Sequence, residues 1–349
     1  MIRITHLLAL LLLLGACSGE SARAPADIAS EVPEDLLVTE VEADLAPDLA
    51  PDLPEDLAGN ADDTASIPDT PADVPPPPCP TWGAAETVGH LANADLFELS
   101  GLVASRTVPG VFWAHNDSGD GPRLFALDAT GADLGVVDID GAQAKDWEDI
   151  GIGPCPGAAG DCLYIGDIGD NPRTRSKITV YVVPEPSLGE DGQWTTDDGR
   201  RVSAAMVVHL TYPDGARDAE ALLVDPGTGD VYVIEKTTEG SSTVYRAAAP
   251  LTAGGPTVME TLGDVGMGIV TGADITADGA LILVRNYFAA AALRRPPGTD
   301  LADAFVGLPC DALLGMEFQG ESVAFTGLGV DYVTIAEGAG ATVFHITAE

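Results

Sequence analysis

Residues 79–349 repeat one pattern, and this repeat limits the possible folds more than any other feature of the sequence. Each copy has an acidic or polar start, an apolar strand, a glycine-containing turn, and then a second and a third apolar strand. The five copies start with E-L-S-G-L-V from Glu98, D-W-E-D-I-G from Asp146, D-A-E-A-L-L from Asp218, T-G-A-D-I-T from Thr271 and Q-G-E-S-V-A from Gln319. Such small units bury both of their faces only when they pack on neighbouring units, as propeller blades do. The sequence therefore predicts an all-β fold, a β-propeller of five blades.

Two details of the repeat concern ring closure and blade number. The last copy ends near Thr347 without a fourth strand, whereas E-T-V-G-H-L from Glu86 precedes the first copy and has no partner. We therefore expect this N-terminal strand to complete the last blade and close the ring. A degenerate blade within residues 294–316 gives six blades instead, and this alternative stays open.

The third residues of the five aligned starts fix the spacing of the units. These residues are Ser100, Glu148, Glu220, Ala273 and Glu321, separated by 48, 72, 53 and 48 positions. The long interval indicates an insertion, which we place at 189–201 and expect to be an exposed loop because it is rich in Gly and Asp.

The charge of the chain excludes one class of partners. The sequence has 55 Asp and Glu but only 16 Lys and Arg, which gives a formal net charge of -39. A surface this negative repels phosphate backbones. We expect no nucleic-acid partner, and we expect the protein to be a monomer.

The N-terminus has the features of an exported, lipid-anchored protein. Arg3 precedes an apolar run, and Leu14-Gly15-Ala16-Cys17 resembles the bacterial lipobox, in which the cysteine receives a lipid. An ordinary secretory signal that ends in cysteine is the alternative. Residues 1–17 are thus predicted to be a lipoprotein signal peptide with lipidation at Cys17. Ser18 directly follows the cysteine, and a serine at this position resembles lipoproteins that are sorted to the outer membrane. We therefore expect the protein to be anchored in the bacterial cell envelope, at the outer membrane.

Residues 18–78 are predicted to form a stalk between this anchor and the propeller at 79–349. The segment is rich in Asp, Glu and Pro and contains no aromatic residue. It cannot bury enough apolar surface to offset the entropy of ordering, so we expect it to be disordered.

Four cysteines remain after Cys17 and are expected to form two disulfides, since export permits them. Three pairings are formally open. Cys155 and Cys162 lie seven positions apart in a turn-rich segment and can close a hairpin, which leaves Cys79 for Cys310. Metal binding by the four is the weaker alternative because no C-x-x-C spacing is present.

Propeller geometry brings many acidic residues to one edge of the ring. The starts of the first strands and the turns between second and third strands share that edge, and residues two apart on a strand face the same side. The candidate metal ligands there are Glu98, Asp117, Asp146, Asp149, Asp167, Asp218, Asp274 and Glu321.

Carboxylates this close cannot all stay ionised without protons or cations. A set of oxygen ligands suits calcium, the predicted cofactor, better than magnesium, which requires stricter geometry. The tentative catalytic residues are His115, Glu148 and Glu220, and the tentative substrate-binding residues are Asn116, Lys236 and Arg285. In the competing interpretation these side chains only cap turns and bond backbone N–H groups.

Several segments also carry a family resemblance. S-G-L-V-A-S, W-A-H-N-D-S-G-D, D-W-E-D-I, G-D-I-G-D-N, Y-P-D-G-A-R-D-A-E-A-L-L-V-D and Q-G-E-S-V-A-F resemble a group of exported bacterial β-propeller lipoproteins of uncertain activity. The resemblance covers nearly all of 86–347, and a more distant one points to calcium-dependent lactonase and phytase-type propellers. It implies binding or hydrolysis at a metal-bearing end of the ring. The cluster of basic residues that a phytase uses for its phosphates is not matched.

Three functions are therefore considered. In the first, the propeller binds calcium at its acidic edge and binds or hydrolyses a small ester, lactone or phosphoester. In the second it is a non-catalytic interaction module on the cell surface. The third is glycoside hydrolysis on a glycan, because carboxylate pairs about 5 to 10 Å apart support that reaction.

Overall fold

The computed structural model describes residues 74–188, 194–195, 201–204, 206–327 and 329–349. The predicted signal peptide with Cys17, most of the predicted stalk and most of the insertion at 189–201 lie outside the described residues. No helix in the described part of the chain is both long and apolar enough to cross a membrane.

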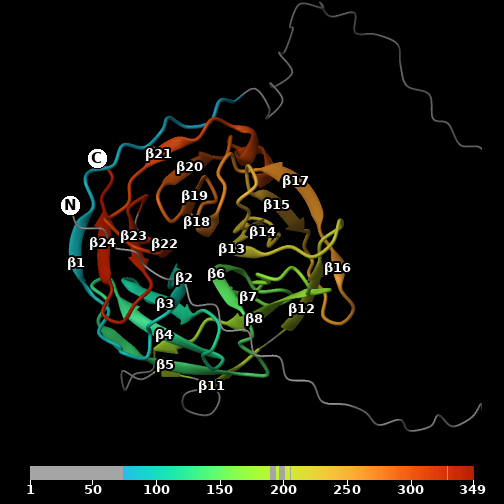
Figure 1. The fold of residues 1–349 in the computed structure, drawn as a ribbon, viewed down its shortest axis with the longest axis horizontal. Coiled ribbons are helices and arrows are strands. Elements are labelled where there is room, and N and C mark those ends of the chain that lie inside the picture. Colours follow the sequence, from blue (N-terminus) through green and yellow to red (C-terminus); the bar gives the residue numbers. More distant parts are fainter. Residues whose placement is uncertain (1–73, 189–193, 196–200, 205, 328) are drawn as a thin grey trace, which may run out of the picture. The chain divides into compact units, whose positions relative to one another are not determined.

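Five sheets, antiparallel except for one parallel edge strand in each of blades 1 and 2, stand around a common axis and form a five-bladed β-propeller (Figure 1). The innermost strands are β2 (Leu99–Ala104), β6 (Trp147–Pro154), β13 (Ala219–Val224), β18 (Val270–Ile275) and β22 (Gly320–Phe325). Each contacts the next around the ring, and β22 contacts β2. The all-β, five-bladed prediction is thus confirmed.

Blades 1 and 2 have five strands each. In blade 1, β2 is followed outward by β3 (Val111–Asn116), β4 (Arg123–Asp128), β5 (Asp133–Asp140) and β11 (Arg201–Ser203). In blade 2, β6 is followed by β7 (Asp161–Asp167), β8 (Ile178–Pro184), β12 (Met206–Thr211) and β16 (Thr257–Val258).

Blades 3 and 4 have four strands each. Blade 3 has β13, β14 (Val231–Glu235), β15 (Thr243–Ala247) and β17 (Glu260–Asp264). Blade 4 has β18, β19 (Leu281–Asn286), β20 (Ala290–Arg294) and β21 (Cys310–Ala312). Residues 294–316, the alternative place for a sixth blade, hold a 3-10 helix at Leu301–Val306 and this edge strand, so they form no blade of their own.

Blade 5 confirms the expected closure of the ring. It has β22, β23 (Tyr332–Ala336), β24 (Thr342–Ile346) and, outermost, β1 (Glu86–His90). The N-terminal strand β1 pairs antiparallel with the C-terminal strand β24, as the unpaired strand at each end of the repeat required.

The insertion in the second repeat contributes short strands that pair with other strands of the structure. β11 pairs in parallel with β5 of blade 1, and β9 (Ser187–Leu188) pairs with β10 (Trp194–Thr195). Trp194 is buried and packs edge-on against Trp113 with 4.7 Å between ring centroids. The expectation of an exposed loop is therefore wrong at Trp194, because an indole on blade 1 offers its ring a partner.

The core is divided among the five interfaces between blades. Alternate residues of each strand face opposite sides, so each sheet packs on both neighbours. Each of five buried clusters joins two adjacent blades, for example Trp113 of blade 1 with Ile150 of blade 2. The two disulfides also match the predicted pairs, Cys79 with Cys310 and Cys155 with Cys162.

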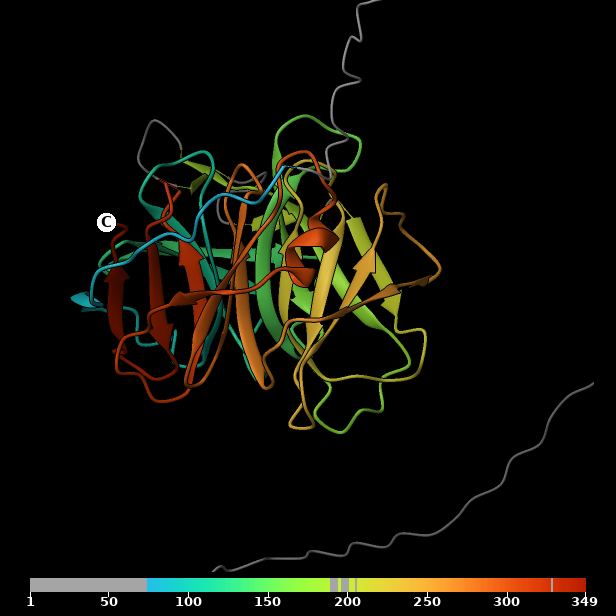
Figure 2. The same ribbon diagram turned by 90° about the horizontal axis from the view of Figure 1, so that it is seen from above.

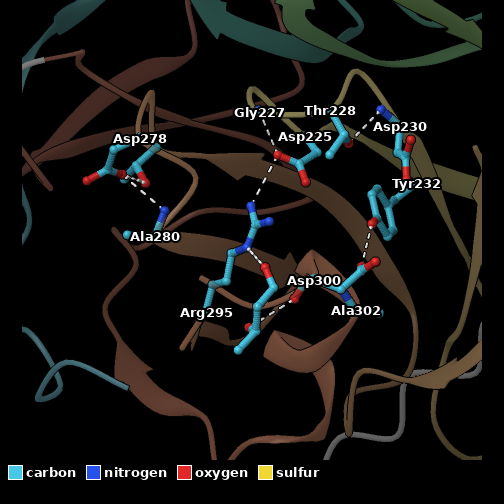
Figure 3. A network of polar contacts seen from close by, with 12 residues as sticks. Asp225, Gly227, Thr228, Asp230, Tyr232, Asp278, Ala280, Arg295, Asp300 and Ala302 are labelled. Carbon is cyan, nitrogen blue, oxygen red and sulfur yellow. Dashed lines mark hydrogen bonds and ion pairs between the residues drawn. The ribbon is translucent and has the colours of Figure 1, made fainter. Parts of the chain in front are cut away.

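The ring has two edges, which Figure 2 shows from the side. We call the edge at which the innermost strands begin the entry edge, and the other, which carries the turns between first and second strands, the opposite edge. At the opposite edge acidic side chains do cap turns (Figure 3). Asp225 accepts hydrogen bonds from the backbone N–H of Gly227 at 2.8 Å and from Arg295 at 3.2 Å. Asp300 caps the 3-10 helix through the N–H of Ala302 at 2.9 Å.

Candidate metal centre

A β-bulge occurs near the start of the innermost strand in every blade. The pairing with the second strand shifts register at Glu148 in blade 2, Glu220 in blade 3 and Glu321 in blade 5. The extra residue is Thr271 in blade 4, and blade 1 has Ser100 with Gly101 there. A bulge re-aims the side chain of the unpaired residue. The repeat thus brings one buried polar side chain per blade to the entry edge, and three of the five are glutamates.

Blade 4 differs from the sequence alignment by two residues. The alignment placed Ala273 in the series of Glu148 and Glu220, whereas the bulge in β18 is at Thr271. Ala273 packs instead in the buried cluster between blades 3 and 4. The alignment was based on acidic residues, and it failed in this unit because the bulged residue is a threonine. The acid of the unit, Asp274, comes three positions after it.

Three carboxylates from blades 1 and 2 form the tightest group. Ligand oxygens of Asp117, Asp146 and Glu148 all lie within 4.8 Å of one another. The backbone of Gly169 lies directly against two of them: a Cβ there would lie 2.1 Å from Glu148 Oε1 and 2.6 Å from Asp146 Oδ2. Only glycine lets both carboxylates lie this close to the turn after β7.

A second group connects blades 3, 4 and 5. Lys236 forms an ion pair with Glu220, and its Nζ donates to the Tyr287 hydroxyl at 2.8 Å. That hydroxyl donates to Glu321 Oε1 at 3.4 Å. We call Asp117, Asp146, Glu148, Glu220 and Glu321 together the axial cluster.

The charges of the axial cluster are poorly balanced, and the pKa values reflect this. Burial, and then the Glu220 carboxylate, raises the pKa of Glu148 well above its ordinary value. Burial raises the pKa of Glu220 to about 7, although Lys236 lowers it. Burial and the neighbouring Glu337 raise the pKa of Glu321 to about 9, and burial raises that of Asp117 to about 6. Mutual repulsion among these groups means that the cluster needs protons or a cation.

Two oxygens of the cluster show that such a partner is needed. Glu220 Oε2 and Glu321 Oε2 are buried and have no hydrogen-bond partner among the described residues. Glu220 and Glu321 are only 4% and 5% exposed. A buried carboxylate oxygen without a donor is costly, so its presence indicates a proton or a bound cation. The donor set, all oxygen and mostly carboxylate, fits calcium.

Two of the predicted metal ligands are bound elsewhere. Asp149 Oδ2 accepts from the backbone N–H groups of Leu222 at 2.9 Å and Ala273 at 3.3 Å, which links blades 2, 3 and 4. Asp274 Oδ2 accepts from Phe325 N at 2.7 Å and links blade 4 to blade 5. Burial raises the pKa of both groups, that of Asp274 to about 7. Their oxygens already hold the innermost strands together, which matches the turn-cap interpretation rather than metal ligation.

The other three predicted ligands lie around the cluster. Asp167 forms an ion pair with Arg175 at 2.8 Å, and Asp218 accepts from Asp170 N at 2.8 Å. Burial raises the pKa of Asp146, and repulsion from Asp218 and Asp167 raises it further, as burial and then Glu98, among other acids, do for Asp117. These three acids therefore add negative charge beside the axial cluster.

His115, a tentative catalytic residue, lies away from the entry surface. It is fully buried against Trp147, edge to face with 5.4 Å between ring centroids, and a Cβ on Gly101 would lie 2.2 Å from its Nε2. Burial lowers its pKa to about 4, so the imidazole is neutral at ordinary pH. Its role as a general base stays a prediction that this placement does not favour.

The tentative substrate-binding residues also have different surroundings. Lys236 belongs to the site, as described above. Arg285 is fully buried and donates to Glu317 at 2.8 Å and to the Ser322 carbonyl at 3.0 Å. Asn116 is buried and bonds Glu98 N and Asp120, which fastens the turn after β3. Arg285 and Asn116 thus hold the walls of the site together.

Tyr287 and Arg175 are residues of this region that the sequence analysis missed. Tyr287 directly follows the second strand L-I-L-V-R-N, at the same point of the repeat as Asp117 and Lys236. This position in the repeat could have identified Tyr287 as a site residue from the sequence. Its contact with Lys236 crosses from blade 4 to blade 3 and depends on how the blades pack.

Comparisons with known proteins give no family for this chain. The sequence matches no protein-family model and no curated protein. Solved structures similar to it include the PQQ-bound form of aldose sugar dehydrogenase from Streptomyces coelicolor, at 12% identity and a TM-score of 0.42, covering 79% of this chain and all of the other. Glutaminyl cyclase from Myxococcus xanthus is similar at 11% identity and a TM-score of 0.40, covering 76% of this chain and 97% of the other. Neither likeness bears on activity, and the resemblance to exported lipoproteins stays a prediction.

Proposed function

We propose that the axial cluster binds calcium and that the protein uses this site to bind and hydrolyse a small ester, lactone or phosphoester. One observation carries the proposal: carboxylates from blades 1, 2, 3 and 5 converge at the entry edge, and two of their buried oxygens have no described partner. Acids at the opposite edge, by contrast, are occupied with turns and arginines. The convergence therefore calls for a ligand.

Asp117, Asp146 and Glu148 are the residues that would hold the ion, because their oxygens already lie within 4.8 Å of one another. When bound, calcium supplies a Lewis acid that polarises an oxygen of the scissile group. Glu98 lies beside this group and adds charge that favours a divalent cation.

Glu220 is the residue best suited to move a proton. Its pKa of about 7 is close to neutral pH, where a general base works best, and its Oε2 has no described hydrogen-bond partner. Oε2 is the atom that would take the proton of an attacking water. Lys236 holds the other oxygen, and Tyr287 fixes Lys236 in place through its hydroxyl.

The cellular setting completes the proposal. A lipid on Cys17 and the acidic stalk at 18–78 would hold the propeller away from the bacterial outer membrane. These features come from the sequence alone.

A turnover screen tests the proposed activity. The full chain is assayed with aryl esters, lactones and phosphoesters, with calcium and with a chelator. We expect hydrolysis of at least one class, lost with the chelator and reduced at least about 100-fold in Glu220→Gln. Glu239→Gln, an exposed acid in the turn that follows Lys236, is the matched control and should stay active. Calcium binding without any turnover would identify a non-catalytic interaction module, and release of reducing sugar from polysaccharides would identify a glycoside hydrolase.

A further inference from the structure

A polar pocket of about 510 Å³ lies on blade 2 beside the axial cluster. Residues before β6, residues of the turn between β7 and β8, and side chains of β8 and β12 form its walls. The lining residues are Gln143, Lys145, Asp167, Thr174, Arg175, Ser176, Lys177, Thr179, Tyr181 and His209. Its volume is that of an ordinary small-molecule site.

The pocket gathers positive charge in a strongly negative chain. The whole sequence contains three lysines, and two of them, Lys145 and Lys177, line this pocket together with Arg175 and His209. Asp167 is the single acid among the lining residues, and Arg175 neutralises it at 2.8 Å. Neither lysine forms an ion pair within the described part of the chain, although the chain has 55 acidic residues.

This arrangement has an electrostatic cost that a ligand would relieve. Burial, and then charge repulsion from Lys177, lowers the pKa of His209. Asp167 and Asp146 offset part of the positive charge of Lys145, but neither lysine has an ion-pair partner among the described residues. An anion between the two lysines would form charge-assisted hydrogen bonds. Thr179, which lies 3.3 Å from His209 Nδ1, adds a hydroxyl to the lining.

The pocket is connected to the axial cluster through one residue. Arg175 lines the pocket and donates to the carbonyl of Gly169 at 2.7 Å. Gly169 is the residue whose backbone lies against the carboxylates of Asp146 and Glu148. Arg175 therefore connects the wall of the pocket to the backbone that lies against the candidate calcium ligands.

We propose that this pocket binds an oxyanion, a carboxylate or phosphate group, and that it holds the anionic end of the molecule whose ester is hydrolysed at the axial cluster. The second half of this statement rests on the proposed function, whereas the first half stands without it. Lys145 and Lys177 bind the anion, and Arg175 forms the wall on the side of the cluster.

Calorimetry with inorganic phosphate and with succinate tests the pocket on the full, calcium-free chain at low ionic strength. We expect saturable binding of at least one anion at millimolar concentration. Binding of phosphate but not succinate would identify a phosphate site, and binding of succinate but not phosphate would identify a carboxylate site. Binding of both would identify a general oxyanion site. The Lys145→Gln/Lys177→Gln variant should bind at least about tenfold more weakly. Both lysines are exposed, so this variant should keep its melting temperature.

Two further variants separate the pocket from the axial cluster. Arg173→Gln changes an exposed arginine of the same turn that does not line the pocket, and Glu220→Gln changes the axial cluster itself. Both should bind the anion as the unmodified chain does, even if no ester substrate exists. Absence of binding to either anion, unchanged binding in the double lysine variant, or loss of binding in Glu220→Gln would overturn the proposal.

Discussion

At the scale of single residues, Gly169 offers the finest control over the candidate metal ligands. A methyl group there would collide with Glu148 Oε1 and Asp146 Oδ2, which are the ends of flexible side chains and can move. We expect Gly169→Ala to weaken calcium binding about tenfold or more with little change in melting temperature, because the ligands shift while the strands stay in place. Calorimetry and thermal unfolding measure the two effects.

Gly121→Ala is the matched control for this prediction, since a Cβ at Gly121 meets no atom within 4 Å. It should bind calcium normally. Equal affinity in the two variants would mean that Asp146 and Glu148 do not hold the ion.

The raised pKa values of the buried acids predict an unusual pH dependence of stability. Burial raises the pKa from 4.5 to about 7 for Glu220 and to about 9 for Glu321. At a pH between its ordinary pKa and its raised pKa, each of these groups is protonated in the folded chain and ionised in the unfolded chain. The folded chain then binds more protons, so the free energy of unfolding falls as pH rises. Asp274, with a pKa raised to about 7, acts in the same direction.

Melting temperatures measured with a chelator should therefore decrease between about pH 5 and pH 9. Calcium should restore stability most at the high end, where the cluster is ionised. A calcium-free melting temperature that is flat or increases over this range would show that the axial carboxylates are already compensated in the folded chain.

At the scale of structural elements, the two disulfides close loops of very different length. Cys79 and Cys310 are 231 positions apart, whereas Cys155 and Cys162 are 7 apart. In the chain-entropy model, removing the long connection costs about 5 kcal/mol and removing the short one about 2 kcal/mol. Cys79 precedes the closing strand β1, and Cys310 begins the outer strand of blade 4.

The variants Cys79→Ser/Cys310→Ser and Cys155→Ser/Cys162→Ser test this difference by urea unfolding of the full chain. We expect the larger loss of stability in the first pair. A larger loss in the second would show that the hairpin after β6, rather than the connection beside the ring closure, limits unfolding.

The elements also show how far the sequence carries the account. Strand pairing follows from apolar periodicity and turn residues, so the blades and the pairing of β1 with β24 could be predicted. The bulges could not, because one extra residue leaves no mark in an apolar pattern, and Ala273 was therefore aligned in place of Thr271. Contacts between blades, such as Lys236 with Tyr287, depend on packing between repeats and were also missed.

The same limit applies to burial. His115 and Arg285 have residue types that are common in functional sites, and both lie at or next to the last residue of a second strand. The sequence does not show that both side chains turn into the walls between blades, where each is fully buried.

At the scale of the whole molecule, acidic side chains greatly outnumber basic ones, 55 Asp and Glu against 16 Lys and Arg. With a net charge of -39, the chain attracts divalent cations diffusely, so weak binding alone says little about the site. The specific claim is that one site of higher affinity exists and that it depends on the axial cluster.

The anchor is a second property of the whole molecule that can be tested. If Cys17 carries a lipid, Cys17→Ser should move the protein from the membrane fraction of an expressing bacterium to the soluble envelope fraction. Metabolic labelling with a radioactive fatty acid gives an independent measurement. Membrane recovery of the unlabelled variant would mean that the lipobox is not the anchor.

Calcium titration by calorimetry on the full chain, at physiological salt to suppress diffuse binding, tests the central claim most directly. We expect one saturable site that raises the melting temperature and is lost in Asp146→Asn/Glu148→Gln, but kept in Asp278→Asn, which changes a turn cap at the opposite edge. No heat and no thermal stabilisation at millimolar calcium, or equal binding in the two variants, would contradict a calcium site at the axial cluster.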